Sequence, residues 1–446
     1  GLKYTSSCTI VTANTDIQCS TVAGYGKDLK FIVTVASQSS TLTSTSLDYA
    51  APTITGLSPT VYSTTAGGDT VTITGTGFGA ASHTDINATY GTFTATPCYW
   101  ISSTSVQCTT VTGIGKELAW TLEVGEQTSG SFATLTRYAV PTVASVTLTS
   151  GSVLNVTGTS TVEIEGTNFG PSGTPSITYG GSDGLKYTPS SSCTMVTPHT
   201  KIQCTTVAGY GKDLKFIVYV ATQSSTLKSS TLDYAAPTIT GLSSTPFSTS
   251  GGTIITITGT GFGAAFHTDI SATYNTFTAT PCYWISSTSV QCTTVTGIGK
   301  ELAWTLEVGE QTSGSFATLT RYAVPTVASV TLTSGSVLNV TGTSTVEIEG
   351  TNFGPSGTPS ITYGGSDGLK YTPSSSCTMV TPHTKIQCTT VAGYGKDLKF
   401  IVTVASQSST LKSTELDYAA PTITGLSPTV YSTTAGGDTV TITGTG

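Results

Sequence analysis

Charged side chains are scarce in this chain. Asp, Glu, Lys and Arg make up only 9% of its 446 residues, whereas a typical soluble domain has roughly 25%. The 17 basic residues are outnumbered by 24 acidic ones, which gives a net charge of −7. Nucleic-acid binding needs clustered Lys and Arg to neutralise phosphates, so this composition argues against it. A surface this poor in charge needs another source of solubility, and covalent glycans are the candidate.

Long apolar runs and helical signals are missing as well. No apolar run approaches the roughly 20 residues needed to span a bilayer, so we expect no membrane span in this stretch. Met occurs only twice, and apolar residues do not recur at helical spacing. Thr, Ser and Gly are abundant instead, and β-branched side chains favour strands while Gly breaks helices. The composition predicts an all-β fold.

The chain repeats itself internally. Segments that begin Pro-Thr-hydrophobic recur alternately 88–89 and 96 residues apart, which defines a short and a long type of unit. Residues 92–218 recur without change at 276–402, and such repetition indicates tandem domains. The predicted units are residues 1–51 (the closing half of a long unit), 52–140 (short), 141–236 (long), 237–324 (short), 325–420 (long) and 421–446 (the opening half of a short unit).

Short strands alternate with turn signals inside each unit. The apolar residues of one predicted strand lie two apart, at Leu118, Trp120, Leu122 and Val124. This period-2 alternation indicates strands with one buried and one wet face, as in a sandwich of antiparallel sheets. Units of roughly 90 residues also match the size of an immunoglobulin-like sandwich. Each unit is therefore expected to bury a core of its own.

Two halves of a known domain pattern are present in the short unit. Residues 52–59 read PTITGLSP and residues 67–79 read GGDTVTITGTGFG, followed later by Cys98 and by SVQCTT at 105–110. In order and spacing, these motifs resemble the IPT/TIG domain of plexins, Met-type receptors and certain transcription factors. The long units keep the pattern more loosely, and Thr110 stands where many members have Pro. The resemblance implies tandem immunoglobulin-like sandwiches.

Ten cysteines form five close pairs in the sequence, with none left over. Nine or ten residues separate the two members of each pair, and no His lies at ligand spacing, so a zinc site fits poorly. We predict five disulfides, each stabilising its unit by roughly 2–3 kcal/mol. Regular bridges imply an oxidising compartment, hence secretion or a cell surface. The predicted pairs are Cys8–Cys19, Cys98–Cys108, Cys193–Cys204, Cys282–Cys292 and Cys377–Cys388.

The motifs that could carry chemistry have simpler explanations. Gly75-x-Gly77-x-Gly79 follows a strand, but no helix follows it as a phosphate site requires, so a tight turn is predicted. Glu163 and Glu165 are too few for a calcium site, although a structural ion between units stays an alternative. We expect no enzyme, no catalytic residue, no cofactor and no metal. The four His stand singly in loops, at His83, His199, His267 and His383.

Covalent sugars are the modification that the sequence predicts. Three Asn-x-Thr sequons, at Asn87, Asn155 and Asn339, are N-glycan candidates in a secreted eukaryotic protein. Ser/Thr-rich runs at 39–46, 190–192 and 224–230 are candidates for O-glycans, with plain polar loops as the alternative.

The four Trp residues occur only in the short units. Trp120 shares the apolar register, so we expect it in the core. Trp100 is expected beside the disulfide, with a sugar platform or an interface anchor as the alternative.

The joints between units are short, and a Pro at the start of each unit stiffens them. We therefore predict an extended rod that serves as a structural subunit of an extracellular, glycosylated filament or surface rod, with copies of itself as partners. A stalk of an adhesin or receptor ectodomain, presenting a distal binding domain, is the alternative. Accessory modules of a carbohydrate-active enzyme are a second one. The acidic charge and paired Cys argue against a transcription factor.

Both ends of the chain fall inside a unit. The first residue is Gly1 rather than Met, so a leader could have been removed. We expect a window on a longer repetitive chain. Completion of the two half-units between subunits is the alternative, but the joined halves would lack the equivalent of residues 169–183.

Overall fold

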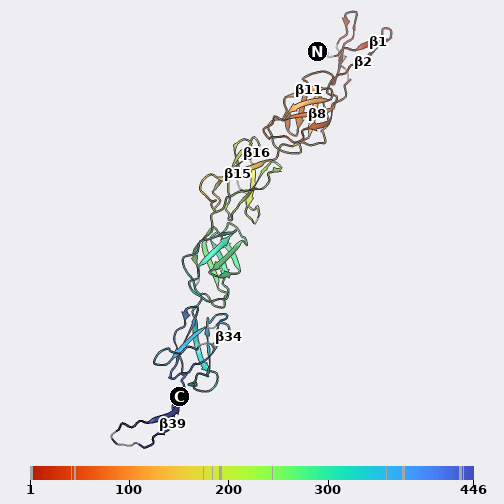
Figure 1. Cartoon of the computed structure of the whole chain (residues 1–446). Helices are drawn as coiled ribbons and strands as arrows, with labels where there is room; N and C mark the ends of the chain where they lie inside the picture. The colour runs from red at the N-terminus through yellow and green to blue at the C-terminus, as the bar shows by residue number, and fades with distance from the viewer. Residues whose placement is uncertain are drawn as a thin grey trace. The chain divides into compact units, whose positions relative to one another are not determined.

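The computed structural model describes residues 4–41, 43–44, 47–173, 175–182, 184–189, 193–243, 245–357, 359–373, 377–430, 434 and 436–446. The predicted O-glycan run at 190–192 and part of the run at 39–46 lie outside the described residues. The chain divides into two compact parts, Gly1–Tyr234 and Ala235–Gly446. Within the described residues both parts consist of strands and connecting loops without helices, which confirms the all-β prediction (Figure 1).

The first short sandwich consists of two four-stranded antiparallel sheets. Their strand orders are β11-β12-β8-β7 and β10-β9-β13-β14. Non-consecutive neighbours such as β12 and β8 give the crossovers of an immunoglobulin-like sandwich. The strands are β7 (Thr53–Ser58), β8 (Thr70–Thr76), β9 (Ile86–Tyr90), β10 (Phe93–Ala95), β11 (Cys98–Ser102), β12 (Ser105–Thr109), β13 (Trp120–Val124) and β14 (Gln127–Thr128).

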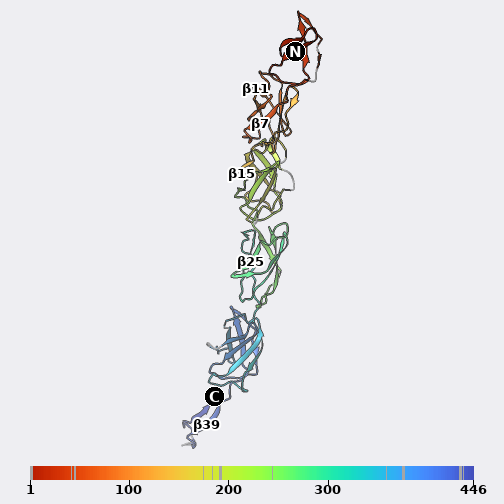
Figure 2. The same ribbon diagram turned by 90° about the vertical axis from the view of Figure 1, so that its right-hand side faces the viewer.

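The first long sandwich follows in the same part of the chain and keeps the same plan. Its sheets have the orders β15-β16-β19-β18 and β17-β20-β21, with β22 also paired to β20. The strands are β15 (Thr142–Leu148), β16 (Thr161–Thr167), β17 (Ser176–Gly180), β18 (Thr194–Thr197), β19 (Lys201–Thr205), β20 (Lys215–Val220), β21 (Gln223–Ser224) and β22 (Lys228–Ser229). β7 and β15 open these two sandwiches (Figure 2).

The second part repeats this short–long pair. Its short sandwich has the sheets β27-β28-β24-β23 and β26-β25-β29-β30, and its long sandwich has β31-β32-β35-β34 and β33-β36-β37, with β38 on β36. The strands are β23 (Thr238–Leu242), β24 (Ile254–Thr260), β25 (Ile270–Tyr274), β26 (Phe277–Ala279), β27 (Cys282–Ser286), β28 (Ser289–Thr293), β29 (Trp304–Val308), β30 (Gln311–Thr312), β31 (Thr326–Leu332), β32 (Thr345–Thr351), β33 (Ser360–Gly364), β34 (Thr378–Thr381), β35 (Lys385–Thr389), β36 (Lys399–Val404), β37 (Gln407–Ser408) and β38 (Lys412–Ser413). The chain is therefore a tandem array of immunoglobulin-like sandwiches, as predicted.

Each sandwich is held by a core of its own. In the first short sandwich Trp120 is fully buried and stacks on Tyr90 with 4.7 Å between ring centroids. The Tyr90 and Tyr138 hydroxyls share a 2.8 Å hydrogen bond, and Tyr138 donates to the Val111 carbonyl at 2.6 Å. Burial raises the pKa of Tyr62 to about 12, so this ring stays neutral in the core. The predicted core position of Trp120 is confirmed.

The Gly-rich motif of the short unit allows close packing of the backbone. A Cβ atom on Gly75 would lie 1.8 Å from the Thr53 carbonyl oxygen and 2.7 Å from the Phe78 ring. Gly77 has a φ of +79°, which disfavours other residues. The motif therefore closes the β7–β8 pair and seats Phe78 in the core, in agreement with the predicted turn.

The described residues of the terminal stretches form only two-stranded sheets. Their strands are β1 (Ser7–Thr12), β2 (Asp16–Ser20), β3 (Lys30–Phe31), β4 (Thr34–Val35), β5 (Gln38–Ser39), β6 (Thr43–Ser44), β39 (Thr422–Ser427) and β40 (Thr441–Thr445). Without a facing sheet, their apolar residues stay exposed. Ile442 is 61% exposed, whereas Ile73 at the matching place in β8 is fully buried.

Candidate functional site: the junction between sandwiches

A polar contact joins the first short sandwich to the first long one. Thr65, in the loop between β7 and β8, is 1% exposed. Its backbone NH donates to Asn168 Oδ1 at 3.2 Å, and its hydroxyl is bonded to His199 Nδ1 at 2.7 Å. Asn168 Nδ2 in turn donates to the Val140 carbonyl at 3.1 Å. In a tandem protein, such contacts decide how freely neighbouring sandwiches move.

Local turn geometry presents the two long-sandwich residues to Thr65. Asn168 follows β16 and His199 lies in the β18–β19 turn, with φ values of +63° and +66°. Asn and His tolerate this left-handed region better than most residues. The two turns are bonded to each other, because Phe169 NH donates to the His199 carbonyl at 3.0 Å and His199 NH donates to the Gly170 carbonyl at 2.7 Å. Both side chains are therefore held by backbone contacts.

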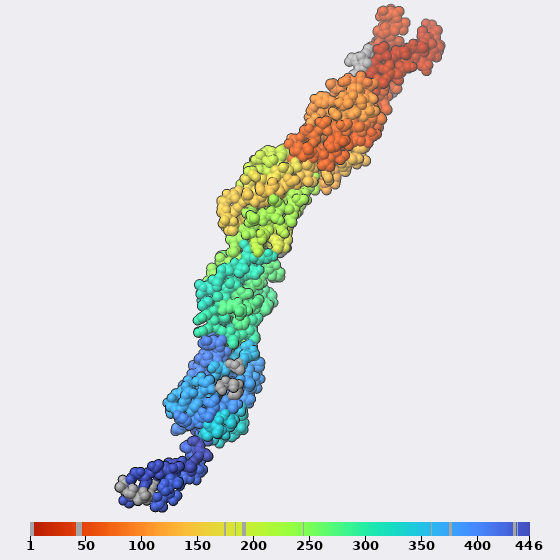
Figure 3. All heavy atoms as spheres, viewed as in Figure 1, coloured from red at the N-terminus to blue at the C-terminus, as the bar shows by residue number. Residues whose placement is uncertain are grey.

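Two further contacts close the same junction. Gln223 Nε2 donates to the Tyr138 carbonyl at 3.0 Å, and Gln223 is 7% exposed. Ile114 packs so closely that a Cβ on Gly170 would lie 2.7 Å from its Cγ2 atom. In the space-filling view the two sandwiches, coloured orange and yellow to green, adjoin without a visible gap (Figure 3). The contact combines buried hydrogen bonds with apolar packing.

The second part of the chain repeats the junction. The Thr249 hydroxyl is bonded to His383 Nδ1 at 2.9 Å, and Gln407 Nε2 donates to the Tyr322 carbonyl at 3.0 Å. Asn352 Nδ2 donates to the Val324 carbonyl at 3.2 Å. A Cβ on Gly354 would lie 2.7 Å from Ile298 Cγ2. The same geometry therefore recurs wherever a short sandwich precedes a long one within a part.

The contact from a long unit to a short one uses different residues. Tyr25 stacks on His83 with 3.9 Å between ring centroids, and its hydroxyl donates to Asp85 Oδ2 at 3.0 Å. Gln127 Nε2 donates to the Tyr49 carbonyl at 2.6 Å. His83 also bonds through Nε2 to the Phe78 carbonyl at 2.9 Å. His267 repeats this bond with the Phe262 carbonyl at 2.8 Å, so all four predicted loop histidines make structural contacts.

Acid is expected to weaken the first junction. Burial lowers the pKa of His199 from its ordinary value of 6.5, so the folded state binds a proton less readily than the unfolded state. Stability is then fully present above pH 6.5 and declines as the pH falls below it. The denaturation midpoint of the chain should be lower at pH 5 than at pH 7.5, and a His199→Gln variant should show a smaller difference. An equal pH dependence in both proteins would contradict this assignment.

All five predicted disulfides are present, and the described residues contain no free cysteine. Cys98 and Cys108 face each other in the β11–β12 register, as do Cys282 and Cys292 in β27–β28. Each of these two bridges therefore pins an edge strand to the middle of its sheet. Trp100, half-buried next to this bridge, donates from Nε1 to the Phe78 carbonyl at 2.8 Å, so its indole NH is satisfied within the sandwich.

The three sequon asparagines are exposed. Asn87 lies on β9, and Asn155 and Asn339 lie in loops that follow β15 and β31. Asn155 Oδ1 accepts hydrogen bonds from the NH and the hydroxyl of Thr157, at 2.9 and 2.8 Å. Asn339 repeats this turn with Thr341. The acceptor side chains are accessible, and two of them sit in defined Asx turns.

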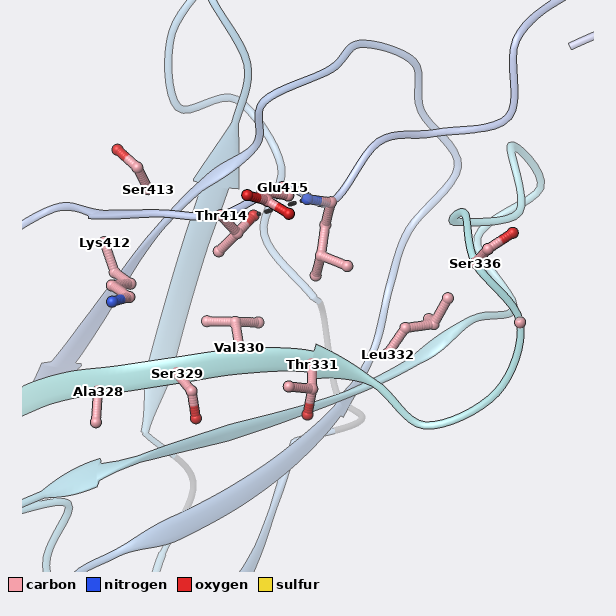
Figure 4. Close-up of a pocket in the computed structure, with 12 residues that line it drawn as sticks. Ala328, Ser329, Val330, Thr331, Leu332, Ser336, Lys412, Ser413, Thr414 and Glu415 are labelled. Carbon is pink, nitrogen blue, oxygen red and sulfur yellow. Dashed lines mark hydrogen bonds between the residues drawn. The ribbon is translucent and has the colours of Figure 1, made fainter.

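A shallow groove of about 480 Å³ runs along one edge of the second long sandwich (Figure 4). Strand β31 lines one side, and residues 412–416 line the other. Leu416 NH donates to Thr414 Oγ1 at 3.2 Å within this second side. Lys412 and Glu415 supply the charged groups, and the remaining lining is Ser, Thr and small apolar side chains.

Acidic and metal-ligating side chains stay dispersed in the part of the chain that the structure describes. No cluster of three or more His, Cys, Asp or Glu side chains at metal-binding distance occurs there. Glu163 and Glu165, which the sequence places on one strand face, both pair with Lys201 at 2.9 Å. Over the same residues, there is no helix with the length and apolar character needed to cross a bilayer.

A family model for the IPT/TIG domain matches residues 52–138 and 237–322. Comparison with curated proteins finds no match. Among solved structures, the plexin A4 extracellular region is 14% identical with a TM-score of 0.21, covering 79% of this chain and 36% of that one. A tetra-tandem repeat from the extending region of a large adhesion protein is 14% identical with a TM-score of 0.28, covering 83% and 100%. Invasin, a bacterial integrin-binding protein, is 13% identical with a TM-score of 0.22, covering 82% and 79%. The chain thus spans about a third of the plexin A4 chain.

Proposed function

Because the chain carries IPT/TIG domains at residues 52–138 and 237–322, we propose that it is a structural subunit of an extracellular, glycosylated filament or surface rod. The repeated short-to-long junction is the observation that supports this most. Thr65 with His199 and Thr249 with His383 make the same half-buried contact in two separate parts of the chain. A protein that only binds one partner needs one specialised domain, whereas a mechanical element needs every joint to be alike.

The disulfides support the proposed location. Five bridges with no free cysteine among the described residues suit an oxidising compartment, outside the cell or at its surface. Four of the bridges lie within one sandwich each, and Cys8–Cys19 lies within the β1–β2 hairpin, so every sandwich keeps its own protection against unfolding. This is the arrangement that an exposed structural protein requires.

Antibody labelling tests this function. An antibody raised against the chain, used for immunogold electron microscopy of the native source, should label filaments or rods along their whole length. Label confined to one segment of a longer filament or rod that ends in a different domain would favour the alternative, a stalk that carries a distal binding domain. If the antigen is found in the soluble fractions that contain a carbohydrate-degrading activity, the accessory-module alternative would be favoured.

Glycans at the exposed sequons form part of this proposal. Expressed in a eukaryotic secretory host, the chain should carry sugars at Asn87, Asn155 and Asn339 because these side chains reach solvent. Asn155→Gln should remove one glycan, as read by intact-mass spectrometry before and after enzymatic deglycosylation. The exposed Asn14, which lies outside any sequon, provides the matched control as Asn14→Gln. An unchanged glycan mass for Asn155→Gln would contradict this part of the proposal.

A further inference from the structure

Two sheets of the array carry no charge on their strands. Of the eight four-stranded sheets, only β11-β12-β8-β7 and β27-β28-β24-β23 lack Asp, Glu, Lys and Arg within their described strands. Both belong to short sandwiches. Each of the other six has at least one charged strand residue, and these include Glu123, Glu163, Lys215, Glu307, Glu347 and Lys399.

The outer face of the first of these sheets is covered with hydroxyl groups. On β8, Val71 and Ile73 point into the core while the four Thr between and beside them face outward. Ser105, Gln107 and Thr109 continue this face on β12. Asp69 lies just before β8, where it accepts hydrogen bonds from the Ser63 NH and hydroxyl at 3.0 and 2.7 Å. This neighbouring charge is therefore tied to its own loop.

Apolar side chains stand out from this hydroxyl surface. Tyr99 is 61% exposed and Ile101 is 50% exposed, both on the edge strand β11. The second short sandwich repeats them as Tyr283 and Ile285, and it has Ile254, 61% exposed, in the place of Thr70. Burying exposed aliphatic residues against other apolar atoms is favourable, because it removes apolar surface from water.

Charge favours a second copy of this chain as the occupant of these faces. When two copies meet through the same surface around a two-fold axis, both contribute the same residues to the contact, so a face that carries Glu123 brings like charges into one interface in a chain of net charge −7. The two charge-free sheets are the four-stranded faces on which copies meet without that repulsion. They also leave no unpaired charge buried in the contact.

The size of the faces sets the strength of such a contact. Four strands about 4.8 Å apart and about five residues long cover roughly 300 Å², so two apposed faces bury about 600 Å² in all. Specific interfaces usually bury about 1,200 Å² or more. One face pair is therefore weak alone, and association should grow with the number of short sandwiches engaged.

We propose that β11-β12-β8-β7 and β27-β28-β24-β23 are the surfaces through which copies of this chain pack side by side, an inference that rests on the proposed filament function. Tyr99 and Tyr283 supply the anchoring rings, and the Thr faces supply close, uncharged packing. The contact is apolar and hydroxylic, so it should keep its strength in 1 M NaCl, where exposed ionic contacts are screened.

Sedimentation velocity of the full chain over a concentration series tests this inference. Introducing Tyr99→Glu together with Tyr283→Glu should raise the concentration at which half of the chains associate by about tenfold or more. The matched control, Tyr219→Glu with Thr403→Glu, adds the same two charges to outward positions on long-sandwich sheets and should leave association close to wild type. Tyr99→Ala with Tyr283→Ala removes the rings without adding charge and should weaken association as well.

Three results would overturn the inference. Equal weakening by the test and control pairs would show a general charge effect, and association abolished by 1 M NaCl would show an ionic contact. A wild-type chain that stays monomeric but sediments with insoluble cellulose or chitin, in a manner lost in Tyr99→Ala with Tyr283→Ala, would make a neutral polysaccharide the partner of these faces. The immunogold experiment reads the filament function separately, so a failure of the lateral contact is distinguishable from a failure of the proposed function.

Discussion

Replacing Cys282 and Cys292 together by Ala should destabilise the second short sandwich by about 3 kcal/mol, because the bridge closes a loop of about eleven residues in the unfolded chain. For a domain of this size, that loss corresponds to a fall in melting temperature on the order of 10–20 °C. Differential scanning calorimetry should show one transition moving down while the transitions of the other sandwiches move far less. The bridge acts within one hairpin, so its loss should stay local.

The equivalent variant of Cys98 and Cys108 is the internal control for this result. Residues 92–108 and 276–292 are identical in sequence, so both variants should shift a transition by a similar amount, each in its own sandwich. A single cooperative transition that moves as a whole in either variant would mean that the array shares one core. Such a result would contradict the independent cores observed for each sandwich.

Introducing Val at Gly354 should uncouple the second short sandwich from the second long one. Gly354 has a φ of +92°, and a Cβ there would lie 2.7 Å from Ile298 Cγ2 across the junction. Backbone strain at such a position costs about 1–3 kcal/mol, and the clash adds to it by forcing the two sandwiches apart. We expect ¹⁵N relaxation to show residues 237–324 and 325–420 tumbling with separate, shorter correlation times instead of a common one.

Gly357→Val is the control that introduces backbone strain without the steric clash at Ile298. Gly357 lies three residues further on with a φ of +99°, and no atom of the described residues lies within 4 Å of the position that a Cβ there would occupy. This control should lose a similar amount of backbone stability while the two sandwiches keep a common correlation time. If both variants tumble like wild type, the polar contacts of Thr249 with His383 and of Gln407 with Tyr322 hold the junction, and the packing of Ile298 contributes little.

Much of the fold is readable from the sequence because it depends on local patterns. The alternation at Leu118, Trp120 and Leu122 predicts a strand with one buried face, and all three are buried. The paired Cys spacing likewise predicts hairpin bridges, since two residues about ten apart meet across a tight turn. Periodicity and pairing are short-range signals, so they can be read from the sequence without knowledge of the tertiary structure.

The junction could not be predicted in the same way. Thr65 and His199 are 134 residues apart in sequence, and neither belongs to a motif with a known chemical role. His199 has the appearance of an ordinary loop histidine until the fold places it beside a buried Thr. The sequence signal that remains is repetition, because Thr249 and His383 recur with the same separation. The sequence shows this repeated separation of Thr and His. Its physical reason, the contact between the two sandwiches, is visible only in the structure.

The charge-free sheets show the same limit. The Thr-x-Thr pattern of β8 predicts a wet face, yet the sequence does not tell which strands lie beside it. Only the register that places Gln107 and Thr109 next to Thr72 and Thr70 shows that one whole sheet is uncharged. A property of a surface depends on neighbours brought together from distant segments.

Helical reconstruction of the native particle by electron cryomicroscopy tests the account most directly. We predict density for repeated pairs of short and long sandwiches, with neighbouring chains in contact through β11-β12-β8-β7 and extra density at Asn155 and Asn339. A particle in which this chain occurs once, at the tip or base of another assembly, or in which neighbouring chains meet through the charged sheets, would contradict it.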